Sequence, residues 1–338
     1  MHKSRLYILL FLIIIFLCSC EKIIFKNDPE NNPIENFEYL WNQMNEKYAF
    51  FDVKKVDWDS IYKIYRPRVN NQINNDELFN IMGGMMNELK DGHVNLISSF
   101  NVSRYDITLL GEQNINLRLI KEKYLKEDYY STGSFNHNFI ENGRVGYIRY
   151  SSFGDSHIKD YELDFIFERY KDTDGLIIDI RQNGGGYVTN VFKLISRFSS
   201  GNVVLYRTQI KSGEGKDDFT ELEEVSATNN NKLKYLGKVA VLTDRGTFSA
   251  ASFFAVCTYA YDNIFLIGDT TGGGLGLPNG GQLPNGWTYR FSITRTIAVD
   301  GNNYENGVPP DYTVILSEES VRAGIDDVIE TAVNKILK

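Results

Sequence analysis

The sequence predicts an α/β protein that carries a small helical unit at its N-terminus. Two patterns support this prediction. Apolar residues recur at helical spacing between about residues 34 and 89, and short apolar strands alternate with helical stretches from Arg144 onward. The chain has 338 residues, of which 42% are hydrophobic and 24% are charged, enough for a full-sized core. This composition excludes a disordered chain, a collagen and a multi-span membrane protein.

Charge and cysteine content exclude several further classes. The chain has 36 basic and 44 acidic residues, a formal net charge of −8, and no basic block, so we expect no nucleic-acid partner. Of its three cysteines only Cys257 lies in the body of the chain, and one thiol cannot form an internal disulfide. No group of Cys, His, Asp or Glu has the spacing of metal ligands, so we expect neither a metal nor a cofactor.

The first residues predict export and a lipid anchor. Lys3 and Arg5 precede an unbroken apolar run, 6–18, which is shorter than the roughly 20 residues of a membrane-spanning helix. The run ends in Leu-Cys-Ser-Cys and resembles a bacterial lipoprotein signal, which implies removal of residues 1–19 and lipid attachment at Cys20. An uncleaved membrane anchor is the alternative. Both place the body of the protein outside the cytoplasmic membrane, at the periplasmic face or the cell surface, and residues 20–36 are predicted to be a polar tether.

The remaining chain divides into three predicted segments. Residues 37–100 form the helical domain, with helices near 37–48, 57–65 and 78–89 and an N-cap at Asn75. Residues 101–144 form a β-rich connecting segment that includes a strand-like piece at 116–120. Residues 145–338 form the α/β core. Its strands are predicted at 145–150, 175–181, 239–242, 264–267 and 288–299, and its helices at 158–170, 187–198, 249–261 and 325–337.

Two side chains are candidates for nucleophilic chemistry. His93 follows a glycine directly after the third helical stretch, and Ser249 begins a predicted helix after a short strand. From the residues alone, a structural histidine and an N-cap serine remain open alternatives. A hydroxyl at a helix N-terminus does, however, face partial positive charge, which favours the anion formed during attack.

Two loops could assist such chemistry. The segment Asp179–Gly186 (DIRQNGGG) ends a buried strand in three glycines, which allow backbone amides to point at an oxyanion; a plain strand-to-helix turn remains open as well. Glu305 lies in a Gly/Pro-rich loop, where a carboxylate matters only if it orients an imidazole. The glycines at 272–274 are not followed by Lys-Ser/Thr, so they do not form a phosphate-binding loop.

Taken together, these stretches resemble the C-terminal-processing (tail-specific) serine peptidases, and more closely their tricorn-like branch. The resemblance is carried, in the family's order, by VGYIRYSSFG, GLIIDIRQNGGG, VAVLTDRGTFSAASFFA, IGDTTGGGLG and GVPPDYTV, starting at residues 145, 175, 239, 267 and 307. It implies a ClpP/crotonase-like core with a tricorn-type helical domain at its N-terminus. Residues 101–144 are too few for the family's usual PDZ module.

The resemblance also implies roles for individual residues. Ser249 matches the nucleophile, His93 the base and Glu305 the acidic residue of the tricorn-like branch. The amides of Ala250 and of the turn at Gly184 and Gly185 match the oxyanion hole.

The sequence departs from the family pattern at two glycines. Gly274 stands where the branch with a Ser–Lys pair has its lysine. Gly92 stands where the tricorn-like branch has a serine that helps to orient the histidine.

These observations predict a serine endopeptidase that hydrolyses unfolded or extended polypeptides through an acyl-enzyme on Ser249. The principal alternative is a non-catalytic lipoprotein that binds peptides or another ligand on the same scaffold. Acyl-transfer chemistry of another kind is a third, weaker alternative, because related folds host it. The oligomeric state is left open.

Overall fold

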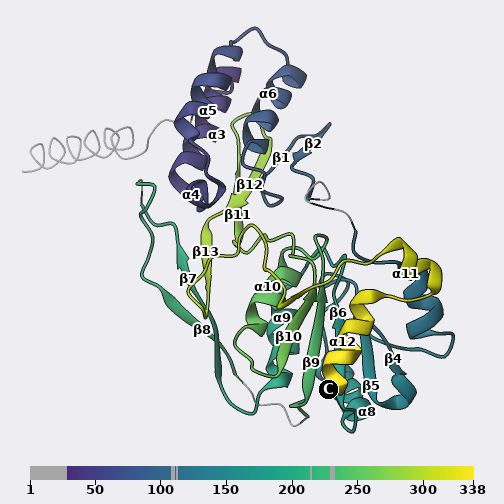
Figure 1. Ribbon diagram of the computed structural model, residues 1–338. Helices are drawn as coiled ribbons and strands as arrows, with labels where there is room; N and C mark the ends of the chain where they lie inside the picture. Colours follow the sequence, from purple (N-terminus) through teal and green to yellow (C-terminus); the bar gives the residue numbers. More distant parts are fainter. Residues whose placement is uncertain (1–28, 108–110, 112, 214, 229–232) are drawn as a thin grey trace, which may run out of the picture.

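The computed structural model describes residues 29–107, 111, 113–213, 215–228 and 233–338. The predicted signal peptide, Cys20 and most of the tether lie outside these residues. Figure 1 shows a helical unit above a larger α/β core. No helix within the described part of the chain is long and apolar enough to cross a membrane.

The helical unit contains four helices, α3 (Pro33–Lys47), α4 (Phe51–Lys54), α5 (Trp58–Tyr65) and α6 (Asn75–Asn87), and a short 3₁₀ turn, Arg66–Arg68. Side chains that cap the first backbone amides determine where its helices begin. Asn32 caps α3 ahead of a proline, so this helix begins inside the predicted tether. The cap of α6 is Asn74 rather than the predicted Asn75, because Asn74 and Glu77 form a reciprocal capping box.

A four-stranded sheet completes this unit. Its strand order is β11 (Pro278–Gln282), β12 (Thr288–Ser292), β1 (Asn95–Ile97) and β2 (Val102–Arg104). Half of this sheet therefore comes from a hairpin that is far along the sequence. One face packs on the helices through buried Leu96, Tyr289 and Phe291. The single strand predicted over 288–299 is wrong: it is two strands, and the second, β13 (Thr294–Ala298), pairs in a different sheet.

The core is built on a seven-stranded sheet whose first five strands are parallel. Its order is β14 (Tyr312–Thr313), β10 (Ile264–Gly268), β9 (Lys238–Thr243), β6 (Gly175–Asp179), β5 (Val145–Tyr150), β4 (Phe135–Ile140) and β3 (Tyr130–Thr132). Helices pack on both faces, which explains why the central strands are apolar throughout. One face carries α8 (Asp160–Tyr170), α9 (Val188–Ile195) and α10 (Ala250–Thr258), and the other carries α12 (Asp327–Leu337).

Several smaller elements differ from the prediction. The strand-like piece at 116–120 is helical: α7 (Leu117–Leu119) runs into a π-helical turn, Ile120–Leu125, because the Asn116 side chain caps the amide of Leu119 at 3.0 Å. The sequence also missed β7 (Val203–Ile210) and β8 (Glu223–Ala227), which form a three-stranded sheet with β13. Short 3₁₀ turns follow β4 (Glu141–Gly143) and α9 (Ser196–Phe198), and α11 (Glu318–Ala323) precedes α12.

A buried ion cluster fixes the C-terminal helix to the sheet. Arg181 is fully buried just beyond β6 and donates hydrogen bonds to Asp179 at 2.7 Å and to Asp326 at 3.1 Å. Asp326 is also the N-cap of α12, accepting from the amides of Val328 and Ile329. The cluster therefore joins the end of β6, next to the glycine turn, to the element that closes the chain.

We expect the substitution Asp326→Ala to lower the free energy of unfolding by about 3–5 kcal/mol, because it removes one partner of a buried charge and the cap of α12. Urea unfolding followed by circular dichroism measures this change. Glu319→Ala, on an exposed position of α11, is the control and should leave stability within about 0.5 kcal/mol. Equal stability of the two variants would contradict the role given to the cluster.

Candidate active site

Two turns at the carboxyl ends of neighbouring parallel strands form the core's part of the site. The turn after β6 leads through Gly184–Gly186 into α9, and the turn after β9 leads through Ser249 into α10. The buried Asp244 joins them, since its Oδ1 accepts from the amides of Gln182 at 2.8 Å and Gly246 at 3.0 Å. This carboxylate, to which the sequence analysis gave no role, sets the position of one turn against the other.

The backbone of Ser249 is held in a rare conformation. Its φ of 56° and ψ of −123° are unfavourable for a residue with a side chain, at a cost of about 1–3 kcal/mol. The surroundings hold it there: the Ser249 amide donates to the Gly273 carbonyl at 2.9 Å, and the Ser249 carbonyl accepts from the amide of Phe253 at 2.8 Å. Ser249 stands at the N-cap of α10, but its hydroxyl makes no capping bond. The hydroxyl is thereby left to other partners.

The Ser249 hydroxyl contacts His93, a residue of the helical unit. Its Nε2 lies 2.9 Å from the Ser249 Oγ, although 156 residues separate them along the chain. His93 lies in the short connection between α6 and β1, where the Asp91 carboxylate accepts from the His93 amide at 2.8 Å and from the Tyr48 hydroxyl at 2.7 Å. The imidazole also packs against the ring of Phe248, with centroids 4.9 Å apart.

The electrostatics of the site keep His93 neutral. Burial lowers the pKa of His93 below its usual value; the charge of Asp91 raises it, and the charge of Arg290 lowers it further. The Gly276 backbone also favours the charged ring, but the buried Nδ1 forms no hydrogen bond of good geometry with any described residue. A neutral imidazole with Nε2 at the hydroxyl is the form that can accept a proton.

The Glu305 carboxylate binds the backbone at residues 275–276. Its Oε2 accepts from the amides of Leu275 at 2.7 Å and Gly276 at 3.0 Å, and no hydrogen bond joins it to His93 among the described residues. Burial and the nearby Asp91 raise the pKa of Glu305 to about 8, against the opposing charge of Lys54, whose Nζ lies 4.0 Å from Oε1. The structure therefore links Glu305 to His93 indirectly, through the backbone of Gly276.

Of the predicted oxyanion residues, Gly185 and Ala250 lie beside Ser249, with one difference from the prediction. Gly185 is buried against the nucleophile turn: a Cβ at this position would lie 2.8 Å from the Ala250 nitrogen and the Ser249 Cβ. Its own amide, however, donates to the Asn183 side chain at 3.0 Å. The amides of Gly184, Gly186 and Ala250 have no acceptor within the described part of the chain. Gly186, which the sequence analysis did not select, is therefore a candidate donor along with Gly184 and Ala250.

Both departures from the family pattern have a steric explanation. A Cβ at Gly92 would lie 2.5 Å from Ile107 and 2.9 Å from the Phe248 ring, so the space for a serine is filled. A Cβ at Gly274 would lie 2.5 Å from the same ring, and the φ of 76° is itself unfavourable for other residues. Position 274 therefore supplies no base, and His93 is the titratable side chain that contacts the Ser249 hydroxyl.

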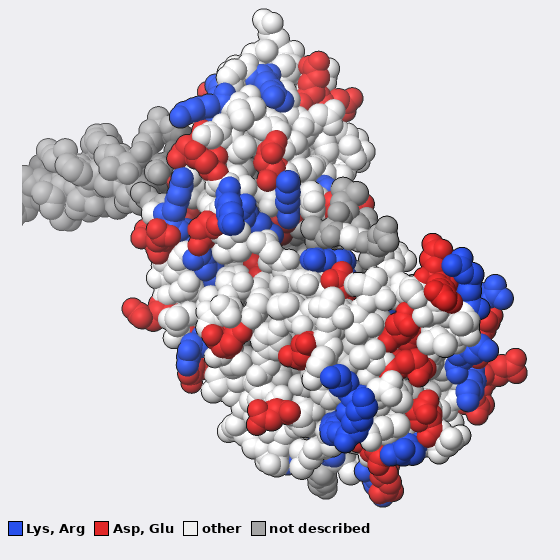
Figure 2. Space-filling model, viewed as in Figure 1, with Lys and Arg blue, Asp and Glu red and all other residues white. Residues whose placement is uncertain are grey.

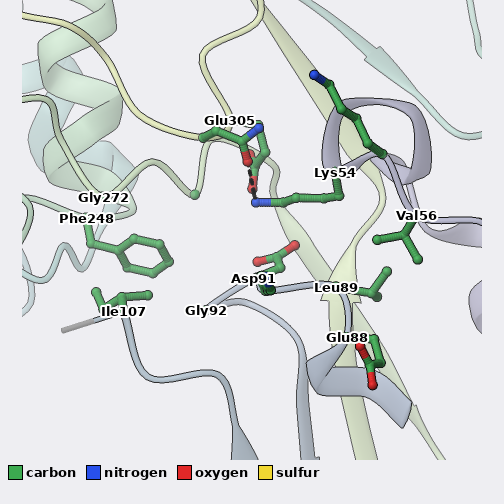
Figure 3. A pocket seen from close by; sticks show the side chains of 14 residues that line it. Lys54, Val56, Glu88, Leu89, Asp91, Gly92, Ile107, Phe248, Gly272 and Glu305 are labelled. Atoms are coloured by element: carbon green, nitrogen blue, oxygen red, sulfur yellow. Dashed lines mark hydrogen bonds and ion pairs between the residues drawn. The ribbon is translucent and has the colours of Figure 1, made fainter. Parts of the chain in front are cut away.

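A pocket of about 440 Å³ opens beside the site, at the junction of the helical unit and the core. Figure 3 shows Lys54 reaching across it towards Glu305, with the Asp91 carboxylate below and the Phe248 ring facing them. Tyr48, Lys54 and Asp91 were not predicted as site residues from the sequence. Only Asp91 left a local signal, because an aspartate two residues before a histidine can form a turn that accepts the histidine amide.

We expect Asp91→Asn to lower the pKa of His93 further, since the substitution removes the nearby negative charge that raises this pKa. Asparagine keeps an oxygen for the His93 amide, so the turn can persist. NMR titration of histidine-labelled protein measures the shift, with exposed His157 as the internal control. An unchanged or higher His93 pKa would contradict the placement of Asp91.

The model of peptidase family S41 matches residues 144–314, and that of the tricorn protease C1 domain matches residues 29–87. The carboxy-terminal processing protease CtpB of Bacillus subtilis is 24% identical over 176 residues, which cover 52% of this chain and 35% of that protein. CtpA of the same organism is 23% identical, over 61% of this chain and 41% of its own length. The chain thus matches well under half the length of these curated relatives.

Solved structures give longer matches. A candidate peptidase from Parabacteroides merdae is 38% identical, with a TM-score of 0.87 over 91% of this chain and 98% of that one. Mature CPAF is 14% identical, with a TM-score of 0.67 over 90% and 97% of the two chains, a likeness of fold. The tricorn protease is 16% identical, with a TM-score of 0.55 over 90% of this chain and 36% of its own.

Proposed function

Because the chain belongs to peptidase family S41, we propose that it is a serine endopeptidase that cleaves extended or unfolded polypeptides through an acyl-enzyme on Ser249. The observation that carries this proposal is the 2.9 Å contact between the Ser249 hydroxyl and Nε2 of a neutral His93. The Ser249 backbone conformation adds support, since a hydroxyl displayed on a sharp strand-to-helix turn is free to attack a bound carbonyl.

In the proposed reaction, His93 removes the Ser249 proton as Oγ attacks the peptide carbonyl. His93 then gives this proton to the leaving amine, and the acyl group stays on Ser249. A water molecule attacks the acyl-enzyme with His93 again as base, which releases the second product and restores the serine. The unengaged amides of Ala250 and of Gly184 or Gly186 hold the negative oxygen at both tetrahedral stages.

Glu305 and Asp91 hold the backbone that positions His93, and Asp91 also contributes its charge. Asp91 fixes the backbone of His93 and supplies a negative charge that favours the imidazolium formed in the reaction. Glu305 fixes the backbone at 275–276, against which the imidazole lies. We assign both residues to the orientation of His93, with no contact to substrate.

The non-catalytic alternative rested on the missing lysine and on Gly92. Both positions are filled by packing around Phe248, and His93 reaches the hydroxyl without either side chain. These contacts favour the peptidase. We further propose that the enzyme acts outside the cytoplasmic membrane, held by a lipid on Cys20, as the sequence before the described residues indicates.

We expect Ser249→Ala and His93→Ala each to reduce hydrolysis of an unfolded protein such as casein by at least about 10³-fold, because nucleophile and base work as a unit. Release of fluorescent fragments measures the rate. Ser200→Ala, at an exposed position, is the matched control and should keep full activity. A fluorophosphonate probe should label the wild type but not Ser249→Ala; equal hydrolysis and labelling by all variants would refute the proposal.

Substitutions of Glu305 separate a positional role from a role of its charge. Glu305→Gln keeps an acceptor for the two amides and resembles the protonated acid, so we expect kcat/KM within a few-fold of the wild type. Glu305→Ala strands two buried donors and should lower kcat/KM by about 10²-fold through displacement of His93. Thermal melts of both variants identify loss of fold. Equally large losses in two folded variants would show that the carboxylate charge itself is needed.

A further inference from the structure

We propose that Arg104 and Arg290 form a carboxylate-binding surface that selects substrates with an acidic side chain on the C-terminal side of the cleaved bond. This inference rests on the proposed peptidase function and names the substrate class of that site. It follows from the register of the four-stranded sheet, from the absence of acidic residues in that sheet, and from the position of Arg290 relative to His93.

The strand register places the two arginines on one face. Asn95 of β1 lies opposite Arg290 of β12 on one side and opposite Arg104 of β2 on the other. Residues that are directly opposite in neighbouring strands point to the same face, and two strand spacings separate the outer pair by about 10 Å. Both guanidinium groups can therefore reach a single carboxylate above Asn95.

No described helix packs on this face, whereas helices cover the other face. Leu96 and Phe291, which point the opposite way, are buried in the helical unit. Arg104 and Arg290 are exposed, and neither forms an ion pair or hydrogen bond with any described residue. On the same face, the neighbouring Ile97 and Val102 are 41% and 52% exposed, which leaves an apolar ledge beside the charges.

The charge of this sheet departs from that of the whole chain. The strands read PNGGQ, TYRFS, NLI and VSR, so their only charged residues are the two arginines. The chain as a whole has a net charge of −8, and on the face seen in Figure 2 acidic and basic side chains are interspersed. Two arginines that pair with no described residue, on strands that carry no acidic residue, form a surface complementary to a carboxylate.

The position of Arg290 indicates which half of the substrate meets this surface. Its charge is close enough to His93 to lower the His93 pKa. His93 must deliver its proton to the leaving amine, so the residues that follow the cleaved bond lie on the side of the site that His93 occupies. β1 follows His93 directly, and its sheet therefore borders the leaving half of the peptide (Figure 1).

The test compares matched peptides in the wild type, Arg104→Gln, Arg290→Gln and the double variant. A cleavage map of an unfolded protein first locates a cut, and two fluorogenic peptides then carry Glu or Gln just after it, both with amidated C-termini. We expect the wild type to favour the Glu peptide by about five- to tenfold in kcat/KM, each single variant to reduce this ratio, and the double variant to abolish it. Hydrolysis of the Gln peptide should stay unchanged in Arg104→Gln. Because Arg290→Gln also removes a charge that lowers the His93 pKa, that variant and the double variant are judged by the Glu-to-Gln ratio alone, and added salt should weaken the preference.

Arg118→Gln removes an exposed arginine on α7 and is the matched control. Binding of the same peptides to Ser249→Ala, read by fluorescence polarisation, tests selectivity even if no variant hydrolyses peptides, and so separates this inference from the proposed function. Equal binding and cleavage of the Glu and Gln peptides by the wild type would overturn it. Two other results would also overturn it. One is a preference for peptides with a free C-terminal carboxylate and none for Glu over Gln. The other is that the double variant no longer binds anionic vesicles but keeps its preference for the Glu peptide.

Discussion

The docking of the helical unit on the core is the constraint on which the candidate site depends. His93 belongs to the first and Ser249 to the second, so their 2.9 Å contact exists only while the two are held together. Several contacts around α4 cross the junction. Arg295 of β13 donates to the Ala49 carbonyl at 2.7 Å, and Lys54 donates to Asn306 at 2.8 Å. The chain itself also crosses this junction, because β12 belongs to the helical unit's sheet and β13 to another sheet of the core. Sliding of the helical unit over the core would break the backbone hydrogen bonds of both strands.

In the core, close contact between the backbones of two turns fixes the position of Ser249. Asp244 holds the turn after β6 against the turn after β9, and Gly185 lets the first turn touch the second where any Cβ would collide with Ser249. These contacts oppose relaxation of the unfavourable Ser249 backbone. The hydroxyl, the free amides and the start of α10 are consequently set before a substrate arrives, which is the arrangement that makes electrostatic stabilisation of an oxyanion effective.

Sequence patterns predicted what is local and repeated. The α/β core, the helical unit and the family resemblance follow from periodicity and from motifs on single turns, and all three predictions are confirmed. Pairings between distant strands were not predictable. Nothing at 278–292 indicates that this hairpin leaves the core to complete another sheet, and the break after Ser292 is set by that change of partner. The site divides in the same way: Ser249 and His93 could be proposed from motifs, whereas Tyr48 reaches Asp91 across 43 residues and Lys54 reaches Glu305 across the junction, without any motif.

The site contains two neighbouring buried carboxylates, Asp91 and Glu305, and the charge of Asp91 opposes ionisation of Glu305. Both oxygens of Asp91 accept hydrogen bonds, from the His93 amide and the Tyr48 hydroxyl, whereas Oε1 of Glu305 has no hydrogen-bond partner among the described residues and faces Lys54 only at 4.0 Å. Two adjacent buried carboxylates do not both ionise readily, because the charge of one opposes the charge of the other. At Glu305, full burial and the charge of Asp91 raise the pKa to about 8, against the opposing effects of Lys54 and the two backbone amides. Asp91 holds the His93 backbone, and its charge raises the His93 pKa, so the group that positions the imidazole also stabilises the charged form of the imidazole.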